Sequence, residues 1–270
     1  MVATDKSFAG SIPEIYDRLM VPLIFAPYAQ DLAGRIAQVE PRDVLETAAG
    51  TGVLTRAIAA RLSEQVRIVA TDLNQPMLDL AATRQPPREG LAWQRADALA
   101  LPFEDRTFGV VACQFGAMFF PDRIKGYGEA RRVLKRGGRF FFNVWDRISE
   151  NEIADVVTAT LAALFPQDPP LFLARTPHGY HDVDRIRGEL AAAGFTDIVV
   201  DSVDLRSKAA SSRDAAVAYC QGTPLRNEIE ARDPSRLEDA TQAAAAALAG
   251  RFGEGPIDGR IRAHVIAATG

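Results

Sequence analysis

The chain has few cysteines, little surplus charge and no long apolar run. Cys113 and Cys220 are its only cysteines among 270 residues, too few for a disulfide framework, so a reducing compartment is expected. The net charge is -4, with 35 acidic residues against 31 lysines and arginines. This balance gives no general attraction to phosphate backbones or anionic lipids. The apolar stretch of residues 20–29 is short and contains Pro22 and Pro27, so stable insertion into a membrane is not expected.

Several functional signatures are also missing. The first ten residues show no cationic start followed by an apolar core, so no signal peptide is predicted and a cytoplasmic location is expected. His178 and His181 have neither a cysteine nor a well-spaced carboxylate nearby, which argues against a metal site. None of the five tyrosines has a lysine four residues later, as a short-chain oxidoreductase would need. The basic cluster from Arg131 to Arg139 lacks interleaved aromatics, so nucleic acid is not an expected partner.

From about residue 41 to 145, short β-branched apolar runs alternate with stretches of helical periodicity. Strands separated by single helices favour right-handed crossovers and a parallel sheet. The predicted strands of this part are residues 44–45, 66–72, 91–95, 108–113 and 139–145, the last beginning after a stop at Gly137 and Gly138.

The second half predicts more helix, interrupted by two further strands. Residues 149–152 read as a capping box that begins a helix up to Leu164. A helix over 182–193, a strand over 197–205, Ala-rich helices over 211–251 and a strand over 261–268 follow. The domains predicted from this pattern are an N-terminal helical cap (1–38), a core (39–206 and 256–270, with a helical insertion at about 149–193) and a helical lid (207–255).

The most informative motif is a glycine-rich turn between two of these strands. Gly50 and Gly52 let the backbone approach a ligand closely, and Asp72, about twenty residues on, suits two ribose hydroxyls. A nicotinamide site would need a third glycine where the chain has Thr55, and Glu46 would repel a pyrophosphate. S-adenosylmethionine carries an ammonium and a sulfonium and no phosphate, so the residues favour it as the cofactor.

On these residues the chain resembles the class I S-adenosylmethionine-dependent methyltransferases, in particular the branch of quinone-biosynthesis C-methyltransferases and other small-molecule methyltransferases. The resemblance is good over about residues 40–146 and weaker beyond; the chain departs from it at Ala48, where the family often has a glycine. It implies an α/β, Rossmann-like, doubly wound and mostly parallel seven-stranded sheet with an antiparallel last strand, plus a helical lid. The segments that carry it are residues 44–52, 70–74, 96–103, 108–123 and 131–138.

The resemblance also implies roles for individual residues. Asp72 is expected to accept from the ribose hydroxyls and Asp97 from the adenine amino group. The other implied cofactor residues are Leu73 and Met77 near the adenine, Ala98 and Leu99 along its ring, Glu46 near the ammonium, Ala48, Gly50, Thr51 and Gly52 along the methionine portion, and Gln114 and Phe115 facing the sulfonium and the acceptor.

The acceptor side is less defined. Tyr16, Phe25 and Tyr28 are expected in a cap over the cofactor, and His178 and Tyr180 are candidate substrate residues. Removing residues 1–30 is expected to leave the sheet folded. No catalytic residue is assigned, because methyl transfer depends mainly on positioning and water exclusion.

The predicted function is S-adenosylmethionine-dependent methyl transfer to a small-molecule acceptor. A non-catalytic S-adenosylmethionine-binding protein acting through partners stays open, as does, less favoured, an NAD-dependent oxidoreductase. The acceptor, the methylated atom and the oligomeric state, a homodimer included, are not determined by the sequence.

Overall fold

The computed structural model describes residues 10–270, which fall into two compact units. Unit 1 contains the chain up to Pro27, Trp145–Tyr180 and Asp204–Arg262, and unit 2 contains Tyr28–Val144, His181–Val203 and Ala263–Gly270. These boundaries differ from the predicted ones at 38, 206 and 255. The predicted cap is divided at Pro27, because the helix that follows packs into the core of unit 2. Residues 1–9 of that cap lie outside the described residues.

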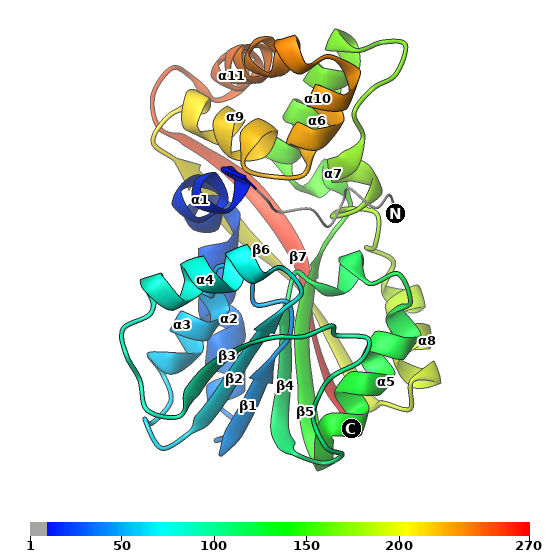
Figure 1. The fold of residues 1–270 in the computed structure, drawn as a ribbon. Helices are drawn as coiled ribbons and strands as arrows, with labels where there is room; N and C mark the ends of the chain where they lie inside the picture. The colour runs from blue at the N-terminus through cyan, green and yellow to red at the C-terminus, as the bar shows by residue number, and fades with distance from the viewer. Residues whose placement is uncertain (1–9) are drawn as a thin grey trace. The chain divides into compact units, whose positions relative to one another are not determined.

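A seven-stranded sheet has the strand order β3-β2-β1-β4-β5-β7-β6 (Figure 1). Strands β1 to β5 pair in parallel. Strand β7 runs antiparallel to β5, because Gly270 at its end donates to Gly138, whereas the carbonyl of Arg262 accepts from Asp146. The predicted α/β class is therefore confirmed. The strands are β1 (Asp43–Glu46), β2 (Arg67–Asp72), β3 (Leu91–Arg95), β4 (Phe108–Gln114), β5 (Leu134–Trp145), β6 (Thr196–Ala209) and β7 (Ile257–Thr269).

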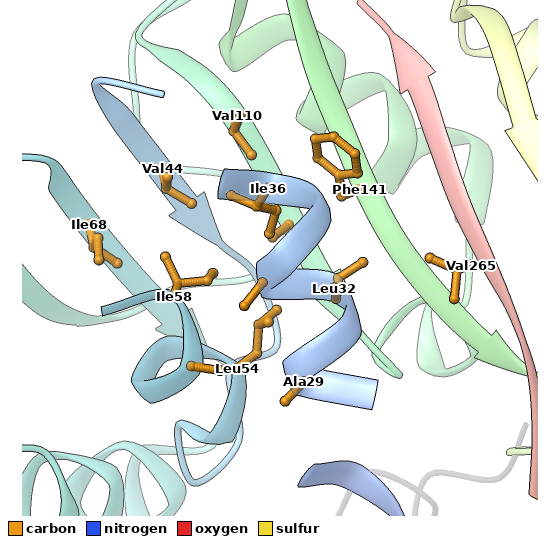
Figure 2. Close-up of a cluster of buried hydrophobic side chains, with 13 residues drawn as sticks. Ala29, Leu32, Ile36, Val44, Leu54, Ile58, Ile68, Val110, Phe141 and Val265 are labelled. Atoms are coloured by element: carbon orange, nitrogen blue, oxygen red, sulfur yellow. The ribbon is translucent and has the colours of Figure 1, made fainter. Parts of the chain in front are cut away.

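One face of the sheet in unit 2 is covered by α2 (Ala26–Ala37) and α3 (Val53–Ala59). Apolar residues recur along α2 at the spacing of one helical face. Figure 2 shows these side chains directed at the strands, where each fully buried Leu or Ile contributes about 1.5–3 kcal/mol. The cluster includes Ala29, Leu32 and Ile36 of α2, Leu54 and Ile58 of α3, and Val44, Ile68, Val110, Phe141 and Val265 of the strands.

The opposite face of β5 packs against α5 (Arg123–Val133). Because side chains alternate along a strand, Phe140 and Phe142 lie on the face opposite to Phe141. The Tyr127 ring of α5 lies 5.4 Å from that of Phe142. An ion pair of 2.8 Å from Arg123 to Glu189 joins α5 to α8 (Val183–Ala192). Helices therefore cover both faces, as the doubly wound prediction requires. Unit 2 also contains α4 (Gln75–Arg84) and η3 (Ala117–Phe119).

The predicted start of β5 was wrong. The strand begins at Leu134, directly after α5, and the glycine pair lies inside it rather than before it. Phe108 pairs with Leu134 and Val110 with Arg139, so β5 holds extra residues between the two pairs. Gly137, with a φ of 72°, supplies the left-handed conformation that this bulge needs.

The predicted capping box was also wrong. Helix α6 (Glu152–Leu164) begins after Asn151, and Ser149 lies in the short turn η4 (Ile148–Glu150). The Glu152 carboxylate accepts from the backbone N–H of Arg260 at 2.6 Å. It is therefore engaged by β7 instead of turning back to the start of its own helix.

Unit 1 is mainly helical. Figure 1 shows α11 beside α9 and α6, and small residues at helical spacing, such as Ala240 and Ala244, are buried there. At the end of η2 the N–H of Ala26 donates to the carbonyl of Val21, the wider spacing of a π-helix, in a segment that contains Pro22. No helix within residues 10–270 combines the length and apolarity needed to cross a bilayer. Besides α6 and η4, the helices of unit 1 are α1 (Ile12–Ile15), η2 (Tyr16–Phe25), α7 (Phe172–Arg175), α9 (Ser212–Gln221), α10 (Leu225–Arg232), η5 (Pro234–Arg236) and α11 (Leu237–Phe252).

Candidate functional site

The predicted cofactor residues all belong to unit 2 and follow the carboxyl ends of its central strands. The loop after β1 is held by both neighbouring strands. The N–H of Thr47 donates to the Ala112 carbonyl of β4, and the N–H of Ala49 donates to the Thr71 carbonyl of β2, each at 2.9 Å. The glycine turn is thus fixed at the sheet edge where parallel α/β sheets bind ligands.

Two glycines of the turn adopt backbone conformations that other residues rarely take. Gly50 has a φ of 56° and Gly52 a φ of 79°. A Cβ on Gly52 would lie 2.7 Å from the Trp93 ring, so that position also requires the absence of a side chain. Trp93 was not among the predicted site residues, yet it lies directly against the turn.

Ala48 is the point at which the chain departs from the resembling family. It has a φ of 54°, a left-handed conformation that costs an L-residue roughly 1–2 kcal/mol. The turn after β4 accommodates its methyl group, because a Cβ on Gly116 would lie 2.4 Å from that of Ala48 and 2.8 Å from the Cys113 sulfur. Burial raises the pKa of the Cys113 thiol to about 11, so the thiol stays protonated and is no nucleophile at neutral pH.

Asp72 connects the loops that follow β1 and β2. It is 7% exposed, its Oδ2 accepts from the Gly50 N–H, and its Oδ1 accepts from the Asn74 N–H, both at 2.8 Å. Burial raises the pKa of this carboxyl, and these backbone hydrogen bonds oppose the rise. A carboxylate offers about four acceptor positions, so ribose binding stays a prediction compatible with these bonds. Next to it, Leu73 is exposed and Met77 buried.

Glu46, at the end of β1, is the most perturbed acid of the site. It is 1% exposed, and its Oε2 accepts from the Thr55 hydroxyl at 2.5 Å. Its Oε1 is buried and has no hydrogen-bond partner within the part of the chain that the structure describes. Burial raises the pKa of Glu46 to about 8, so the carboxyl is mainly protonated at neutral pH. In the sequence Thr55 stands out only as the residue in place of a third glycine. The signal for its role is a hydroxyl within the apolar face of a helix.

The predicted residues Gln114 and Phe115 lie at the carboxyl end of β4: Gln114 is its last residue and Phe115 follows directly. Phe115 has a φ of 50°, and its N–H donates to the Asn143 Oδ1 at 3.0 Å. Asn143 is fully buried, and its Nδ2 has no partner among residues 10–270. The sequence did not single out Asn143, which lies inside a predicted apolar strand. The structure also brings Tyr28 edge-on to the Phe115 ring at 5.4 Å and commits its hydroxyl to the Val203 carbonyl.

Asp97, Ala98 and Leu99 form one turn after β3. The Asp97 carboxylate accepts from the Leu99 N–H at 2.9 Å, and the Ala100 N–H donates to the Asp97 carbonyl at 3.0 Å. The Asp97 side chain is exposed. Its predicted contact with an adenine amino group stays a prediction.

Four predicted acceptor-side residues, Tyr16, Phe25, His178 and Tyr180, belong to unit 1. Two of them lie beside Trp145, a residue not predicted: its ring lies 6.0 Å from that of Phe25 and 5.9 Å from that of His178. The Tyr16 and Phe25 rings are 5.1 Å apart. His178 Nδ1 lies 2.8 Å from the Asp146 carbonyl. A carbonyl only accepts, so Nδ1 carries the ring proton in this contact. Within residues 10–270 no three metal-ligating side chains gather.

The part of the chain that carries the predicted cofactor residues is similar to known methyltransferases. Residues 45–142, all in unit 2, match the family model described as a methyltransferase domain. The chain is 33% identical over 140 residues to demethylmenaquinone methyltransferase of Deinococcus radiodurans, a match over 51% of this chain and 58% of that protein. It is 28% identical over 167 residues to the ubiquinone/menaquinone biosynthesis C-methyltransferase of Idiomarina loihiensis, a match over 57% of this chain and 66% of that protein. The chain thus covers less than two thirds of the length of these curated relatives.

A solved structure extends the likeness to the whole chain. Phosphoethanolamine N-methyltransferase 2 of Haemonchus contortus, in complex with phosphomonomethylethanolamine and S-adenosylhomocysteine, aligns with a TM-score of 0.62 and 16% identity. The alignment covers 100% of this chain and 61% of that one. At this identity the likeness concerns the fold. The family match confirms the resemblance predicted from the five sequence segments: residues 45–142 are similar to the methyltransferase domain.

Proposed function

We propose that this chain, whose residues 45–142 match a methyltransferase domain, transfers a methyl group from S-adenosylmethionine to a small-molecule acceptor. The observation that carries the proposal is the pair of buried acidic side chains at the glycine turn. Glu46 and Asp72 flank it, and Glu46 Oε1 is a buried acceptor without a partner in the described chain. A pyrophosphate there would place its charge close to the Asp72 carboxylate in a poorly solvated place. A ligand with an ammonium would supply the missing donor.

The residues present fit this cofactor. Gly50 and Gly52 place no side chains in the turn, Asp72 offers carboxylate oxygens, and Glu46 offers an unused acceptor. When bound, S-adenosylmethionine supplies an electrophilic methyl group on sulfur. The turn would hold the methionine portion, Asp72 the ribose, and the Asp97 turn the adenine. Phe115 and Gln114 would exclude water from the side on which the acceptor enters.

The acceptor that we propose is an aromatic or quinol-like small molecule. The two relatives are named for methylation in menaquinone and ubiquinone synthesis, and the second is named a C-methyltransferase. The buried rings of Tyr28 and Phe115 in unit 2 suit a flat apolar molecule. The same proposal places the reaction in the cytoplasm.

A ligand-binding measurement tests the cofactor first. Thermal unfolding is followed with S-adenosylmethionine, S-adenosylhomocysteine and NAD. At about one hundred times its dissociation constant, a ligand adds roughly 2.7 kcal/mol, which raises the melting temperature by several degrees in a chain of this size. A shift with the two adenosyl ligands alone supports the proposal. A shift with NAD alone overturns it, and no shift with any of the three argues against a nucleoside cofactor.

An activity measurement then tests methyl transfer. We expect radioactivity from methyl-labelled S-adenosylmethionine to appear in an organic extract with hydroxylated aromatic or quinol acceptors. Binding of S-adenosylmethionine without transfer to any acceptor would favour the non-catalytic alternative.

A further inference from the structure

The Glu46 carboxyl presents its two oxygens to different surroundings. Oε2 accepts from the Thr55 hydroxyl at 2.5 Å, whereas Oε1 is buried without a partner in the described part of unit 2. Thr55 is itself fully buried at the first turn of α3. A buried acceptor that is left unpaired costs free energy, and the fixed bond at Oε2 determines which oxygen stays unpaired.

Three titratable groups on neighbouring elements interact electrostatically with Glu46. Arg56 of α3 favours the ionised carboxylate, and Asp72 at the end of β2 opposes it. On β4, the charge of an ionised Glu46 raises the pKa of the Cys113 thiol. The Arg56 guanidinium donates to the Thr51 carbonyl at 2.6 Å and is the single cation in this set. Two acids and one cation leave the site short of positive charge when both acids are ionised.

Burial is the largest influence on the pKa of Glu46, which rises to about 8. At neutral pH the carboxyl therefore holds a proton that a charged ligand can displace. A cation placed at Oε1 lowers the pKa of this carboxyl, because an opposite charge within about 4–6 Å favours the ionised form. The proton then passes to the solvent while the ligand keeps its own charge.

We propose that Thr55 is a positioning residue which holds Oε2, and that binding of an ammonium-bearing nucleoside, the ligand class of the proposed function, displaces the Glu46 proton into solvent. This inference rests on the proposed function and adds to it a charge requirement. The site selects the ammonium-bearing form of the ligand, and its affinity depends on pH through one carboxyl.

The test is calorimetric titration with S-adenosylhomocysteine in two buffers of different ionisation enthalpy. At about pH 6.5 we expect about one proton released per ligand bound. The dissociation constant should fall up to about tenfold for each pH unit between pH 6 and 7.5. Above about pH 8 the α-amino group of the ligand loses its own charge, so the useful range ends there. The control ligand 5′-methylthioadenosine lacks the ammonium and should bind without releasing a proton.

Three variants separate the roles. Glu46→Gln should bind S-adenosylhomocysteine with no proton release and no pH dependence over this range. Thr55→Val keeps the shape but removes a hydrogen bond that favours the ionised carboxylate. The midpoint of the Glu46 titration, followed by NMR on the ligand-free protein, should therefore move to higher pH. Thr55→Ser restores the hydroxyl and should return the midpoint to that of the wild type. An unchanged midpoint in Thr55→Val would overturn the positioning role.

The remaining outcomes distinguish this inference from the proposed function. Wild-type binding of S-adenosylhomocysteine without proton release overturns the proton displacement and leaves the proposed function standing. No binding of S-adenosylhomocysteine at all overturns both. A readout without ligand is the titration of the Glu46 side-chain carbon by NMR in the wild-type protein. A midpoint near 8 supports the inference, and a midpoint near the ordinary value for glutamate contradicts it.

Discussion

Ala48 and Gly116 constrain each other more tightly than any other pair of site residues. A Cβ on Gly116 would lie 2.4 Å from that of Ala48 and 2.8 Å from the Cys113 sulfur. We expect Gly116→Ala to lower the free energy of unfolding by about 1–3 kcal/mol through overpacking. Ala48→Gly should raise it by up to about 1 kcal/mol, because glycine adopts a positive φ without strain.

The double variant shows whether the two residues act through each other. In Ala48→Gly/Gly116→Ala the methyl–methyl conflict is gone and the contact with the Cys113 sulfur remains. Its loss of stability should therefore be smaller than the sum of the single effects by at least about 0.5 kcal/mol. Urea unfolding of the four proteins measures this coupling. Strict additivity would mean that the two loops adjust independently.

Glu46 gives a pH-dependent contribution to stability. Its pKa rises from 4.5 to about 8 in the folded protein, so the folded state binds a proton more tightly than the unfolded state. The stability that the protonated form contributes is full below the unfolded pKa and is lost as the pH rises through the folded one. Relative to Glu46→Gln, wild-type stability should fall by up to about 1.4 kcal/mol per pH unit across that window. Urea unfolding at pH 5.5 and 7.5 measures it; an equal difference between the two proteins at both values would contradict it.

The residues that sequence reasoning found differ in kind from those that it missed. Gly52 and Asp72 stand out because a glycine and an acid interrupt apolar runs, and the structure gives both a local constraint. Thr55 and Asn143 lie inside apolar patterns, and the sequence around a single polar residue there does not indicate which residue it hydrogen-bonds. Their bonds join residues far apart in the chain, Thr55 to Glu46 and Asn143 to Phe115, and such pairings follow only from the folded sheet.

At the scale of elements, the boundary of α2 gives a sharper prediction than the expectation that removing residues 1–30 leaves the sheet folded. Helix α2 begins at Ala26, the Tyr28 hydroxyl donates to the Val203 carbonyl at 2.7 Å, and Ala29 belongs to the core of unit 2. Deletion through Gln30 should therefore lower the protection of the β1 and β4 amides against hydrogen exchange. A deletion ending at Phe25 keeps the whole helix and is the matched control.

A point variant separates the hydroxyl from the helix turn. Tyr28→Phe leaves the ring beside Phe115 and removes only the hydrogen bond to Val203, so it should cost about 1–2 kcal/mol. Exchange protection that is the same after both deletions would show that the first turn of α2 contributes nothing to unit 2.

Elements marked by a periodic apolar pattern in their own sequence could be predicted, whereas boundaries that depend on contacts with a distant strand could not. The helix and strand order through residues 41–145 agrees with the periodicity, because each helix buries one apolar stripe. The start of β5 was missed, since a glycine pair predicts a stop unless a neighbouring strand continues to pair across it, as β4 does here. The start of α6 was missed because β7, more than one hundred residues later, engages Glu152.

At the scale of the whole molecule, the chain passes between the two units five times, after residues 27, 144, 180, 203 and 262. No composition shift or linker marks these points, which lie within or beside regular elements. Unit boundaries depend on which distant segments pack together, and the sequence pattern reports only neighbours. Strands β5, β6 and β7 contribute residues to both units, so neither unit is a contiguous piece that could fold from its own segment alone.

The shared strands predict that the two units unfold together. The two tryptophans of the chain provide one probe for each, because Trp93 belongs to unit 2 and Trp145 to unit 1. In Trp145→Phe the fluorescence reports unit 2, and in Trp93→Phe it reports unit 1. Within each variant, the urea midpoint from fluorescence should coincide with that from far-ultraviolet circular dichroism, which reports both units.

Comparing two signals within one variant cancels the destabilisation that each substitution causes by itself. Strands β5 and β7 each continue from one unit into the other. Unfolding of one unit therefore removes part of strands that the other unit also uses, and loss of either unit should destabilise the other. Midpoints that separate in either variant would show that the units open independently. In that case a ligand of the glycine turn should raise only the urea midpoint reported by Trp93. Cooperative unfolding requires instead that the ligand raise the midpoints reported by Trp93 and by Trp145 by the same amount.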